Sequence, residues 1–368
     1  MDAGWDTDGS QTGREPRGVD AGRGQRHAAG HDVVVQAGAG LCSALPDVSY
    51  ERAGATVVST AAAVWERADL VLKVKEPMEV ELGLMRPGQV LFAYLHLAAS
   101  LPLTEQLLER RVVAIAYETV QLDDGTLPLL VPMSEVSGRL SVQAGATSLE
   151  MISGGKGIFL PGVSGVRRGR VTIIGAGIVG LNACVVGVGF GADVTIVDIN
   201  PLRLAYVRDV VQGHVTTLMS NAANIEEAVR DADLVICAVL IPGAKTPRLV
   251  TRRHLRLMEH GSALVDVAVD QGGCAETSRP TTHHDPRYIE EGVVHYCVSN
   301  MPGAVPHTST YALTNATMAY ALEIANKGWR EAARDPALAR GVNAVDGRVT
   351  HAAVADAHGL EHTPLERR

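Results

Sequence analysis

Apolar runs rich in β-branched residues alternate with segments of helical composition along most of the chain. The first series covers residues 32–40, 55–59, 68–77, 89–96 and 111–120. After a glycine-rich break, the second series covers residues 170–180, 193–200, 214–218, 232–240, 262–270 and 293–300. Apolar strands separated by helical segments are typical of βαβ units, whose parallel sheets are buried on both faces. We therefore expect an α/β protein with two doubly wound parallel-sheet domains.

The pattern changes after Pro302, where residues 309–335 have the composition of long helices. We expect these helices to return to the first domain and cover it. The number of strands in the second series is enough for a complete Rossmann dinucleotide-binding domain. The expected organisation is a Rossmann domain at residues 129–306, inserted into a first domain made of residues 1–128 and 307–368.

Composition and charge indicate a folded protein and argue against nucleic-acid and membrane partners. A chain of 368 residues, 46% hydrophobic and 20% charged, is expected to fold as two domains and not to be disordered. The net charge of −8 is spread along the chain, so we expect no nucleic-acid partner. We find no signal peptide and no apolar run of about 18 residues, so we expect no membrane partner and a cytoplasmic location.

The cysteines form no CxxC pair and no spacing typical of a metal site. Most of them lie in apolar runs, as reduced structural thiols do. They are Cys42, Cys184, Cys237, Cys274 and Cys297. We therefore expect neither disulfides nor a bound metal.

Gly175, Gly177 and Gly180 have GxGxxG spacing between an apolar strand and a helix. Such glycines allow a tight turn and a close approach of the backbone to a pyrophosphate. Asp198 ends the next strand, where a carboxylate can accept hydrogen bonds from ribose hydroxyls and repel a 2′-phosphate. The combination favours NAD over NADP, although Arg203 lies nearby. The alternative is a glycine-rich turn followed by a helix-capping aspartate.

Two basic residues end strands of the first series. Lys75 can anchor a carboxylate at the edge where parallel sheets present ligands. A solvated surface lysine is an equally good interpretation of Lys75, and Lys73 is an alternative candidate for the anchor. His96 can transfer protons near neutral pH, and a hydrogen-bonded core histidine is the alternative.

The strand at 262–270 carries two aspartates before a glycine pair. Asp270 is the better candidate for a catalytic carboxylate and Asp266 for a structural one, with capping of the following turn as the alternative for Asp270. Residues 300–317 resemble a loop that closes over a nicotinamide, or else a proline-rich linker.

Several segments together resemble NAD-dependent L-alanine dehydrogenases, within the alanine dehydrogenase and transhydrogenase N-terminal superfamily. They are LVLKVKEP, FAYLHLAAS, AYETVQLDDGTLPLLVPMSEVSGRL, GAGIVGLNA, AVLIPGAKTPRLV, VDVAVDQGGCAETSRPTTH and NMPGAVPHTSTYALTNAT, in order between about residues 30 and 335. The resemblance implies reversible oxidative deamination, in which L-alanine, NAD and water give pyruvate, ammonium and NADH. It also implies self-association as a homohexamer.

The resemblance also implies roles for individual residues. Lys75 would hold the substrate carboxylate, His96 would be the general acid and base, and Asp270 would activate water beside the nicotinamide, where we expect it to meet His96. Arg203 stands where the family commonly has a lysine. The cofactor would be lined by Ser134, Gly175, Gly177, Ile178, Val179, Gly180, Asp198, Arg203, Ser220, Val239, Leu240, Val267, Ala268, Val269, Asp270, Arg279, Val298, Ser299, Asn300 and Met301.

Residues 1–27 depart from the family. Its members begin with a β-strand and the pattern KxxExRVAxTPxGV, whose arginine pairs with the substrate carboxylate, whereas this chain has Glu15 at that place. Reading the codons of Asp2 to Gln25 one base later permits MRVGIPTExKxxExRVALTPAGV, where x marks positions that the code leaves open. Our hypothesis is an out-of-frame stretch, with the normal frame regained by about Ala28. The alternative is an ordinary disordered tail.

If residues 1–27 are genuine, the chain is expected to lack part of its carboxylate clamp and one strand of its first sheet. Three alternative functions therefore stay open at this point. They are a catalytically impaired NAD-binding homologue, a transhydrogenase-type protein that passes hydride to a partner, and an opine- or saccharopine-type amino-acid dehydrogenase.

Overall fold

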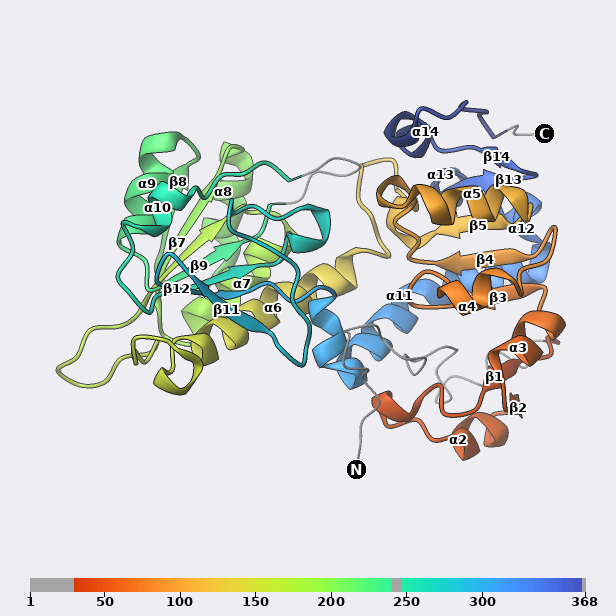
Figure 1. The fold of residues 1–368 in the computed structure, drawn as a ribbon, viewed down its shortest axis with the longest axis horizontal. Helices are drawn as coiled ribbons and strands as arrows, with labels where there is room; N and C mark the ends of the chain where they lie inside the picture. The colour runs from red at the N-terminus through yellow and green to blue at the C-terminus, as the bar shows by residue number, and fades with distance from the viewer. Residues whose placement is uncertain (1–29, 240–245, 366–368) are drawn as a thin grey trace. The chain divides into compact units, whose positions relative to one another are not determined.

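The computed structural model describes residues 30–239 and 246–365, which form two compact units that we describe separately (Figure 1). Unit 1 comprises the residues up to Met133 and those from Val305 onward, and unit 2 comprises Ser134 to Ala304. The second unit is thus inserted in the sequence of the first, as expected. Every run that the sequence predicts to be a strand contains one.

Unit 2 is a seven-stranded sheet with helices packed on it. In spatial order its strands are β11 (Arg287–Glu290), β12 (Val293–Tyr296), β10 (Ala263–Asp266), β9 (Leu234–Cys237), β6 (Arg170–Ile174), β7 (Asp193–Asp198) and β8 (Val215–Met219). Only β11, which the sequence did not predict, is antiparallel to its neighbour. The helices are α6 (Val131–Ser148), α7 (Ile178–Gly189), α8 (Pro201–Val210), α9 (Ala222–Arg230) and α10 (Arg252–Leu255).

The order of strands in unit 2 reverses between β6 and β9. The chain proceeds from β6 to β7 and β8 on one side and then returns to β9, β10 and β12 on the other. The loops that leave β6 and β9 therefore diverge, and in open α/β sheets the crevice at such a switch point is where ligands bind. The residues that follow Ile174 and Cys237 border this crevice.

The opposite ends of β6 and β9 are fastened by a buried aspartate. Asp233, 1% exposed, accepts hydrogen bonds from the Arg167 guanidinium at 2.7 and 3.0 Å and from the Arg170 N–H at 2.8 Å. Lys156 Nζ lies 2.5 Å from the same carboxylate. Burial opposes ionisation, but the hydrogen bonds from Arg167, Lys156 and Arg170 outweigh it and lower the pKa of Asp233 to about 2.

In its described residues, unit 1 contains a five-stranded and a separate two-stranded sheet. The larger sheet has the order β14 (Arg348–Val349), β13 (Val342–Val345), β5 (Val113–Ala116), β4 (Val90–Ala93) and β3 (Leu70–Leu72). The smaller sheet pairs β1 (Val34–Gln36) with β2 (Thr56–Val58) in parallel. The sequence did not predict β13 and β14, which are antiparallel to their neighbours.

Helices of unit 1 come from both ends of its sequence. The first group is α2 (Asp47–Arg52), α3 (Ala61–Arg67), α4 (Glu79–Leu82) and α5 (Leu101–Glu109). The second group is α11 (Pro306–Lys327), α12 (Trp329–Ala332), α13 (Pro336–Gly341) and α14 (Ala352–His358). Residues 300–317 are therefore not one loop, because the short 3-10 helix Met301–Ala304 is followed at once by α11, with Pro306 in its first turn.

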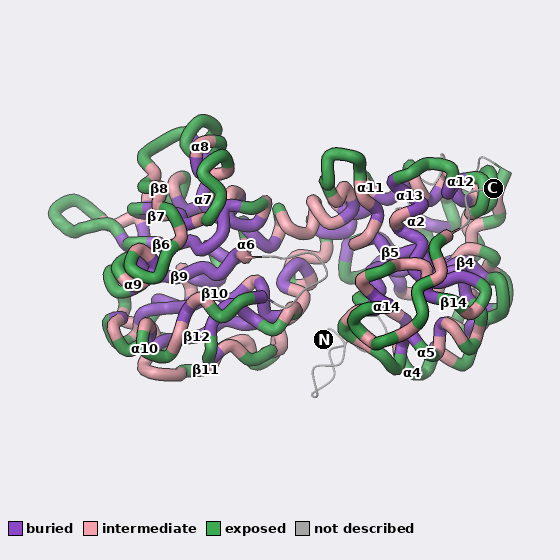
Figure 2. The backbone as a smooth tube through the Cα atoms, turned by 90° about the horizontal axis from the view of Figure 1, so that it is seen from above, coloured by how far each residue is buried: buried purple, intermediate pink, exposed green. Residues whose placement is uncertain are grey.

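The strands of both units form their cores. Figure 2 shows the central strand segments of each unit coloured as buried, with exposed segments at the surface of each unit. Strands β4, β5, β9, β10 and β12 are buried at every position. Within residues 30–239 and 246–365, no helix combines the length and hydropathy needed to cross a membrane. The same residues contain no group of three His, Cys, Asp or Glu side chains suited to a metal ion.

Replacing the buried aspartate should produce a pH-dependent loss of stability. The pKa of Asp233 in the folded protein lies below its value in the unfolded chain, so its contribution is complete above about pH 4 and disappears as the pH falls through about 2. We expect Asp233→Asn to lower the free energy of unfolding by about 2 kcal/mol at neutral pH and by less below about pH 4. Urea unfolding at several pH values measures this.

Glu259→Gln is the matched control, because Glu259 pairs with the same Lys156 but is 71% exposed. This substitution should change the free energy of unfolding by less than about 1 kcal/mol. A loss for Asp233→Asn that does not vary with pH would contradict the assignment.

Candidate functional site

The turn between β6 and α7 depends on two of its three glycines. Gly175 has φ +105°, and a Cβ on it would lie 2.7 Å from the Ala238 carbonyl oxygen. A Cβ on Gly180 would lie 1.8 Å from the Gly175 carbonyl oxygen, so α7 packs directly on the turn. Gly177 differs, because a Cβ there would meet no atom of the described residues within 4 Å, its chain neighbours aside. As the residue that caps α7, it leaves open space before the N–H groups of Ile178 and Val179, which favour an anion.

Asp198 and Arg203 hold the same turn from the side of β7. One carboxylate oxygen of Asp198 accepts the Ala176 N–H at 2.6 Å, and the other accepts the Asn200 N–H at 2.8 Å. Arg203 Nε donates to the Ala176 carbonyl at 3.0 Å. Each carboxylate oxygen can accept more than one hydrogen bond, so these contacts leave Asp198 able to bind ribose hydroxyls.

The other candidates of unit 2 follow the carboxyl ends of its remaining parallel strands. Ser220 follows β8, and its N–H donates to the Asp198 carbonyl at 2.8 Å. Val239 follows β9, residues 267–270 follow β10, and residues 298–301 follow β12. The structure therefore brings these residues to one edge of the sheet. Leu240 lies outside the described residues.

The two aspartates near the end of β10 have different surroundings. Asp266 is buried and accepts the N–H groups of Ala268, Cys274 and Ala275 and the Ser278 hydroxyl. Burial raises its pKa despite these hydrogen bonds. Asp266 thus holds the turn after β10 together.

Asp270 instead is exposed, and its carboxylate accepts the Asn300 N–H at 3.2 Å. Asn300 has φ +55°, which turns the chain after β12 toward this carboxylate. The contact joins the ends of β10 and β12, and it leaves the carboxylate of Asp270 at the surface of unit 2.

Two further candidates lie at the periphery of unit 2. The exposed Arg279 stacks its guanidinium 3.9 Å from the centroid of the Tyr288 ring, which fixes a side chain that is otherwise flexible. Ser134 lies in α6, one turn before Gly138. A Cβ on Gly138 would lie 2.3 Å from the Val179 carbonyl oxygen, so α6 packs against the start of α7.

In unit 1, Lys75 and His96 follow neighbouring strands and lie together. Lys75 comes after β3 and His96 after β4, and Lys75 Nζ is 3.5 Å from His96 Nε2. His96 is exposed and has φ +48° and ψ +38°, a left-handed conformation that is uncommon for residues other than glycine. The ring of Tyr94 is stacked on the imidazole at 6.1 Å between centroids.

Glu118 maintains this conformation, and the sequence analysis did not single it out. Its carboxylate accepts the His96 N–H at 2.6 Å and the Leu95 N–H at 3.1 Å. These contacts involve backbone groups, so no side-chain motif could have indicated them.

Burial distinguishes Lys73 from Lys75 as candidates for the residue that anchors a carboxylate. Lys73 is 7% exposed and forms an ion pair with Glu81, which also accepts the Trp65 indole N–H at 3.4 Å. Lys73 therefore belongs to the core of unit 1, and Lys75 remains the lysine at the strand edge.

His283 is a second residue that the sequence analysis missed. Its Nε2 lies 3.3 Å from the Asn300 carbonyl oxygen, and burial lowers its pKa. His283 thus supports the turn at Asn300, whose N–H donates to Asp270.

Taken together, unit 2 fits a dinucleotide. Open space at Gly177 faces the start of α7, a carboxylate stands at the end of β7, and the switch point lies between β6 and β9. Along the sheet edge, a ribose at the end of β7, a pyrophosphate at the turn after β6 and a second nucleoside beyond the switch point would use these three features.

The glycines of the turn provide a paired test. Gly177→Ala should leave the unfolding temperature almost unchanged, because its Cβ meets no atom of the described residues within 4 Å. It should weaken NADH binding at least about tenfold by occupying the space for the phosphate. Gly180→Ala should lower the unfolding temperature, because its Cβ would overlap the Gly175 carbonyl oxygen. Thermal unfolding and NADH fluorescence titration distinguish the two effects. Equal binding by Gly177→Ala and the unmodified chain would contradict this site.

Comparisons with known proteins agree with this geometry. Residues 19–137 match the family described as alanine dehydrogenase/PNT, N-terminal domain, and residues 141–352 match its C-terminal domain. The alanine dehydrogenase of Geobacillus stearothermophilus is 57% identical over 92% of this chain and 91% of its own length. That of Methanococcus maripaludis (strain S2) is 54% identical over 92% of this chain and 91% of its own length.

Two solved structures are similar over nearly their whole length. An L-alanine dehydrogenase superposes with a TM-score of 0.90 at 48% identity, over 95% of this chain and 97% of that chain. A transhydrogenase from Sinorhizobium meliloti superposes with a TM-score of 0.80 at 25% identity, over 92% of this chain and 97% of that chain. The chain therefore belongs to the alanine dehydrogenase/PNT family.

Proposed function

We propose that this protein is an NAD-dependent L-alanine dehydrogenase, which converts L-alanine, NAD and water reversibly to pyruvate, ammonium and NADH. The observation that carries the proposal is the identity of 53–57% to curated alanine dehydrogenases over at least 90% of the chain. The transhydrogenase-type alternative is not favoured, because that solved structure is 25% identical and the L-alanine dehydrogenase is 48% identical.

Unit 2 is the proposed NAD-binding domain, and unit 1, which includes residues 307–368, is the proposed substrate domain. The carboxylate of Asp198 would accept hydrogen bonds from the adenosine ribose and disfavour a 2′-phosphate, so NAD is preferred to NADP. When bound, the cofactor accepts the hydride that leaves Cα of alanine. The residues after β9, β10 and β12 would hold its nicotinamide half at the sheet edge.

The Lys75 ammonium is the proposed anchor for the substrate carboxylate. An ammonium and a carboxylate form a strong charge-assisted hydrogen bond. Because Lys75 follows β3 immediately and lies beside His96, anchoring the carboxylate there would bring the amine-bearing carbon near the imidazole. The ordered position of His96 follows from Glu118, which holds its backbone.

His96 and Asp270 are the proposed proton carriers. Oxidation of an amine to a ketone needs the removal of protons from the amine and from the attacking water, and a histidine or a carboxylate can accept and return them. His96 is exposed, and its Nε2 lies beside the Lys75 ammonium, where it could reach the amine of an anchored substrate. Asp270 is exposed at the end of β10, where water can reach it.

Substitutions of Lys75 and His96 should act on different kinetic constants. Lys75→Met should raise KM for L-alanine about 10- to 100-fold, because a charge-assisted contact is lost. His96→Gln should lower kcat about 10²- to 10⁴-fold, because general acid and base catalysis is lost. NADH formation from L-alanine and NAD, followed from about pH 7 to 10, measures both constants.

Lys327→Met is the matched control for the lost ammonium, since Lys327 is an exposed lysine of α11 that pairs only with Glu323 in the contacts of the described residues. It should leave kcat and KM unchanged, and all three variants should bind NADH normally. Absence of NADH formation by the unmodified chain with L-alanine would refute the proposed function and favour a non-catalytic NAD-binding protein.

Self-association as a homohexamer is the proposed oligomeric state, and a patch on unit 2 supports it. Large apolar side chains are exposed there on the segment between α6 and β6 and on β11. They are Met151 (79%), Ile152 (92%), Phe159 (63%), Val163 (61%), Val166 (62%) and Ile289 (60%). Several large apolar side chains exposed on these segments are typical of a protein interface. We also place the protein in the cytoplasm, because its cysteines are free thiols and most are buried.

Charges placed in this patch should dissociate the assembly. The double variant Ile152→Asp and Phe159→Asp should reduce the molar mass measured by light scattering after gel filtration, because an interface cannot bury unpaired carboxylates without a large cost. Val80→Asp is the control, since Val80 is 77% exposed and lies in unit 1. An unchanged molar mass for the double variant would remove this patch from the proposed interface.

A further inference from the structure

The proposed proton carrier His96 stands at the start of a 3-10 helix. It caps the helix Leu97–Ala99 in a left-handed conformation, and its own carbonyl accepts the Ala99 N–H at 2.9 Å. The Glu118 carboxylate holds the N–H groups of Leu95 and His96, which come before this helix. A strained residue persists only where its surroundings fix the backbone, so the contacts of the peptide groups after His96 matter as well.

A histidine far along the chain holds the backbone on that side. His358 Nε2 lies 2.7 Å from the Leu97 carbonyl oxygen, although the two residues are 261 positions apart in the sequence. A carbonyl oxygen can only accept a hydrogen bond, so Nε2 carries the proton and donates it. The same oxygen accepts the Ser100 N–H at 3.0 Å and the Thr104 hydroxyl at 3.2 Å. Those two donors belong to the same stretch of chain, whereas His358 ties this carbonyl to a distant element.

Helix α14 presents His358 to the Leu97 carbonyl. The helix packs on this 3-10 helix, and Ala355 lies in the same buried cluster as Leu97. Helix α14 ends at His358, because Gly359 adopts φ +65° and turns the chain back. The Leu360 N–H then donates to the Ala355 carbonyl at 3.0 Å, and the Leu360 side chain packs on the same cluster. The position of the half-buried His358 is therefore fixed on both sides along the chain.

The same C-terminal segment also contacts the loop that carries Glu118. Strand β13 pairs with β5, and Glu118 lies in the 3-10 helix that follows β5. Asn343 of β13 is 1% exposed and accepts the Thr119 hydroxyl at 2.8 Å. Residues 342–360 thus contact both the loop that contains His96 and the loop whose carboxylate holds the His96 N–H.

We propose that His358 is a positioning residue for His96, which acts through the Leu97 carbonyl. Together with Glu118 it fixes the peptide groups on the two sides of His96, so that the imidazole stays beside the Lys75 ammonium. The proposal rests on the proposed function, in which His96 carries protons. His358 itself touches neither substrate nor cofactor, and it raises the fraction of molecules in which the imidazole is correctly placed.

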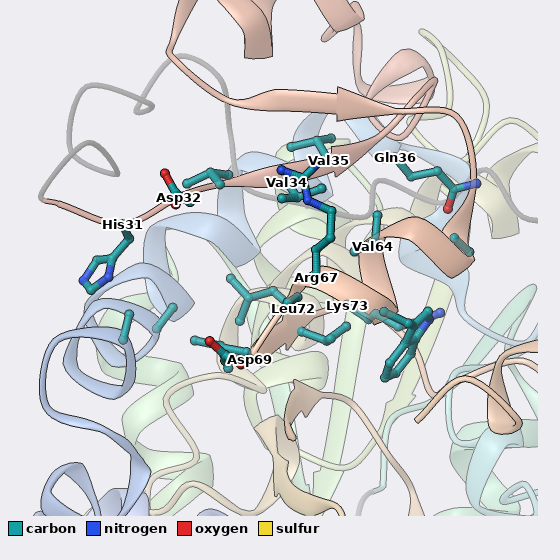
Figure 3. Close-up of a pocket in the computed structure, with 18 of the residues that line it drawn as sticks. His31, Asp32, Val34, Val35, Gln36, Val64, Arg67, Asp69, Leu72 and Lys73 are labelled. Carbon is teal, nitrogen blue, oxygen red and sulfur yellow. The ribbon is translucent and has the colours of Figure 1, made fainter. Parts of the chain in front are cut away.

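Lys75 depends on a different part of the sheet. In the strand order β14, β13, β5, β4 and β3, the strand that precedes Lys75 is the farthest from the C-terminal strands. Among the described residues, β3 borders a cavity of about 480 Å³ that Leu72 and Lys73 help to line (Figure 3). Loss of the His358 donor should therefore disturb His96 more than the lysine that is proposed to anchor the substrate.

Steady-state kinetics of the full chain test the proposal. His358→Ala should lower kcat for L-alanine about tenfold, because a small displacement of a catalytic group removes much of its effect. KM for L-alanine and the affinity for NADH should change by less than about twofold, because substrate anchoring and cofactor binding use other residues. His358→Gln should restore most of kcat, since its amide nitrogen can donate to the same carbonyl.

Hydrogen exchange gives a readout that does not depend on activity. The amides of Leu95 and His96 donate to Glu118, and in His358→Ala they should exchange about three- to tenfold faster than in the unmodified chain. In His358→Gln they should exchange nearly as in the unmodified chain.

His362→Ala is the matched control. His362 lies in the same segment, is exposed, and has its Nε2 3.2 Å from another backbone carbonyl oxygen, that of Thr350. This variant should leave kcat, KM and the exchange of the Leu95 and His96 amides unchanged. It therefore separates the loss of the contact at Leu97 from a general loosening of the C-terminal segment.

Three results would overturn the proposal. The first is equal kcat in His358→Ala and an active unmodified chain. The second is equal exchange of the Leu95 and His96 amides in these two proteins. The third is a loss of kcat that His358→Gln does not reduce or that His362→Ala shares. If the unmodified chain forms no NADH from L-alanine, the proposed function fails, and the exchange comparison alone then decides whether His358 fixes the backbone at His96.

Discussion

Parallel pairing of strands is the constraint on which the candidate site depends. Because neighbouring parallel strands end at the same edge of a sheet, residues far apart in sequence meet where those strands end. In unit 2 this edge gathers the glycine turn after β6, Asp198 after β7 and Asp270 after β10. The buried Asp233 is hydrogen-bonded at the amino ends of β6 and β9, opposite the site. These contacts stabilise the pair of strands between which the switch point lies.

Unit 1 uses the same principle with fewer residues. Lys75 and His96 come together because β3 and β4 are adjacent and parallel. The left-handed conformation of His96 costs free energy, and the Glu118 carboxylate compensates by accepting two consecutive N–H groups. A strained residue maintained in this way is typical of sites where a side chain must be aimed at a ligand.

The sequence by itself determined the strands that are buried on both faces, the glycine turn and the insertion of one unit in the other, because apolar runs and glycine spacing are local signals. It did not reveal β11, β13 and β14, which are short, partly polar and paired antiparallel through contacts distant in sequence. The sequence also did not show whether Lys73 or Lys75 is the better candidate for the carboxylate anchor. It assigned a catalytic role to Asp270 and a structural one to Asp266 only from their distances to a glycine pair. Tertiary structure decided these cases, because burial and the direction of backbone N–H groups depend on which strands become neighbours. The same reason explains why Glu118, which acts only through backbone amides, could be found only in the folded chain.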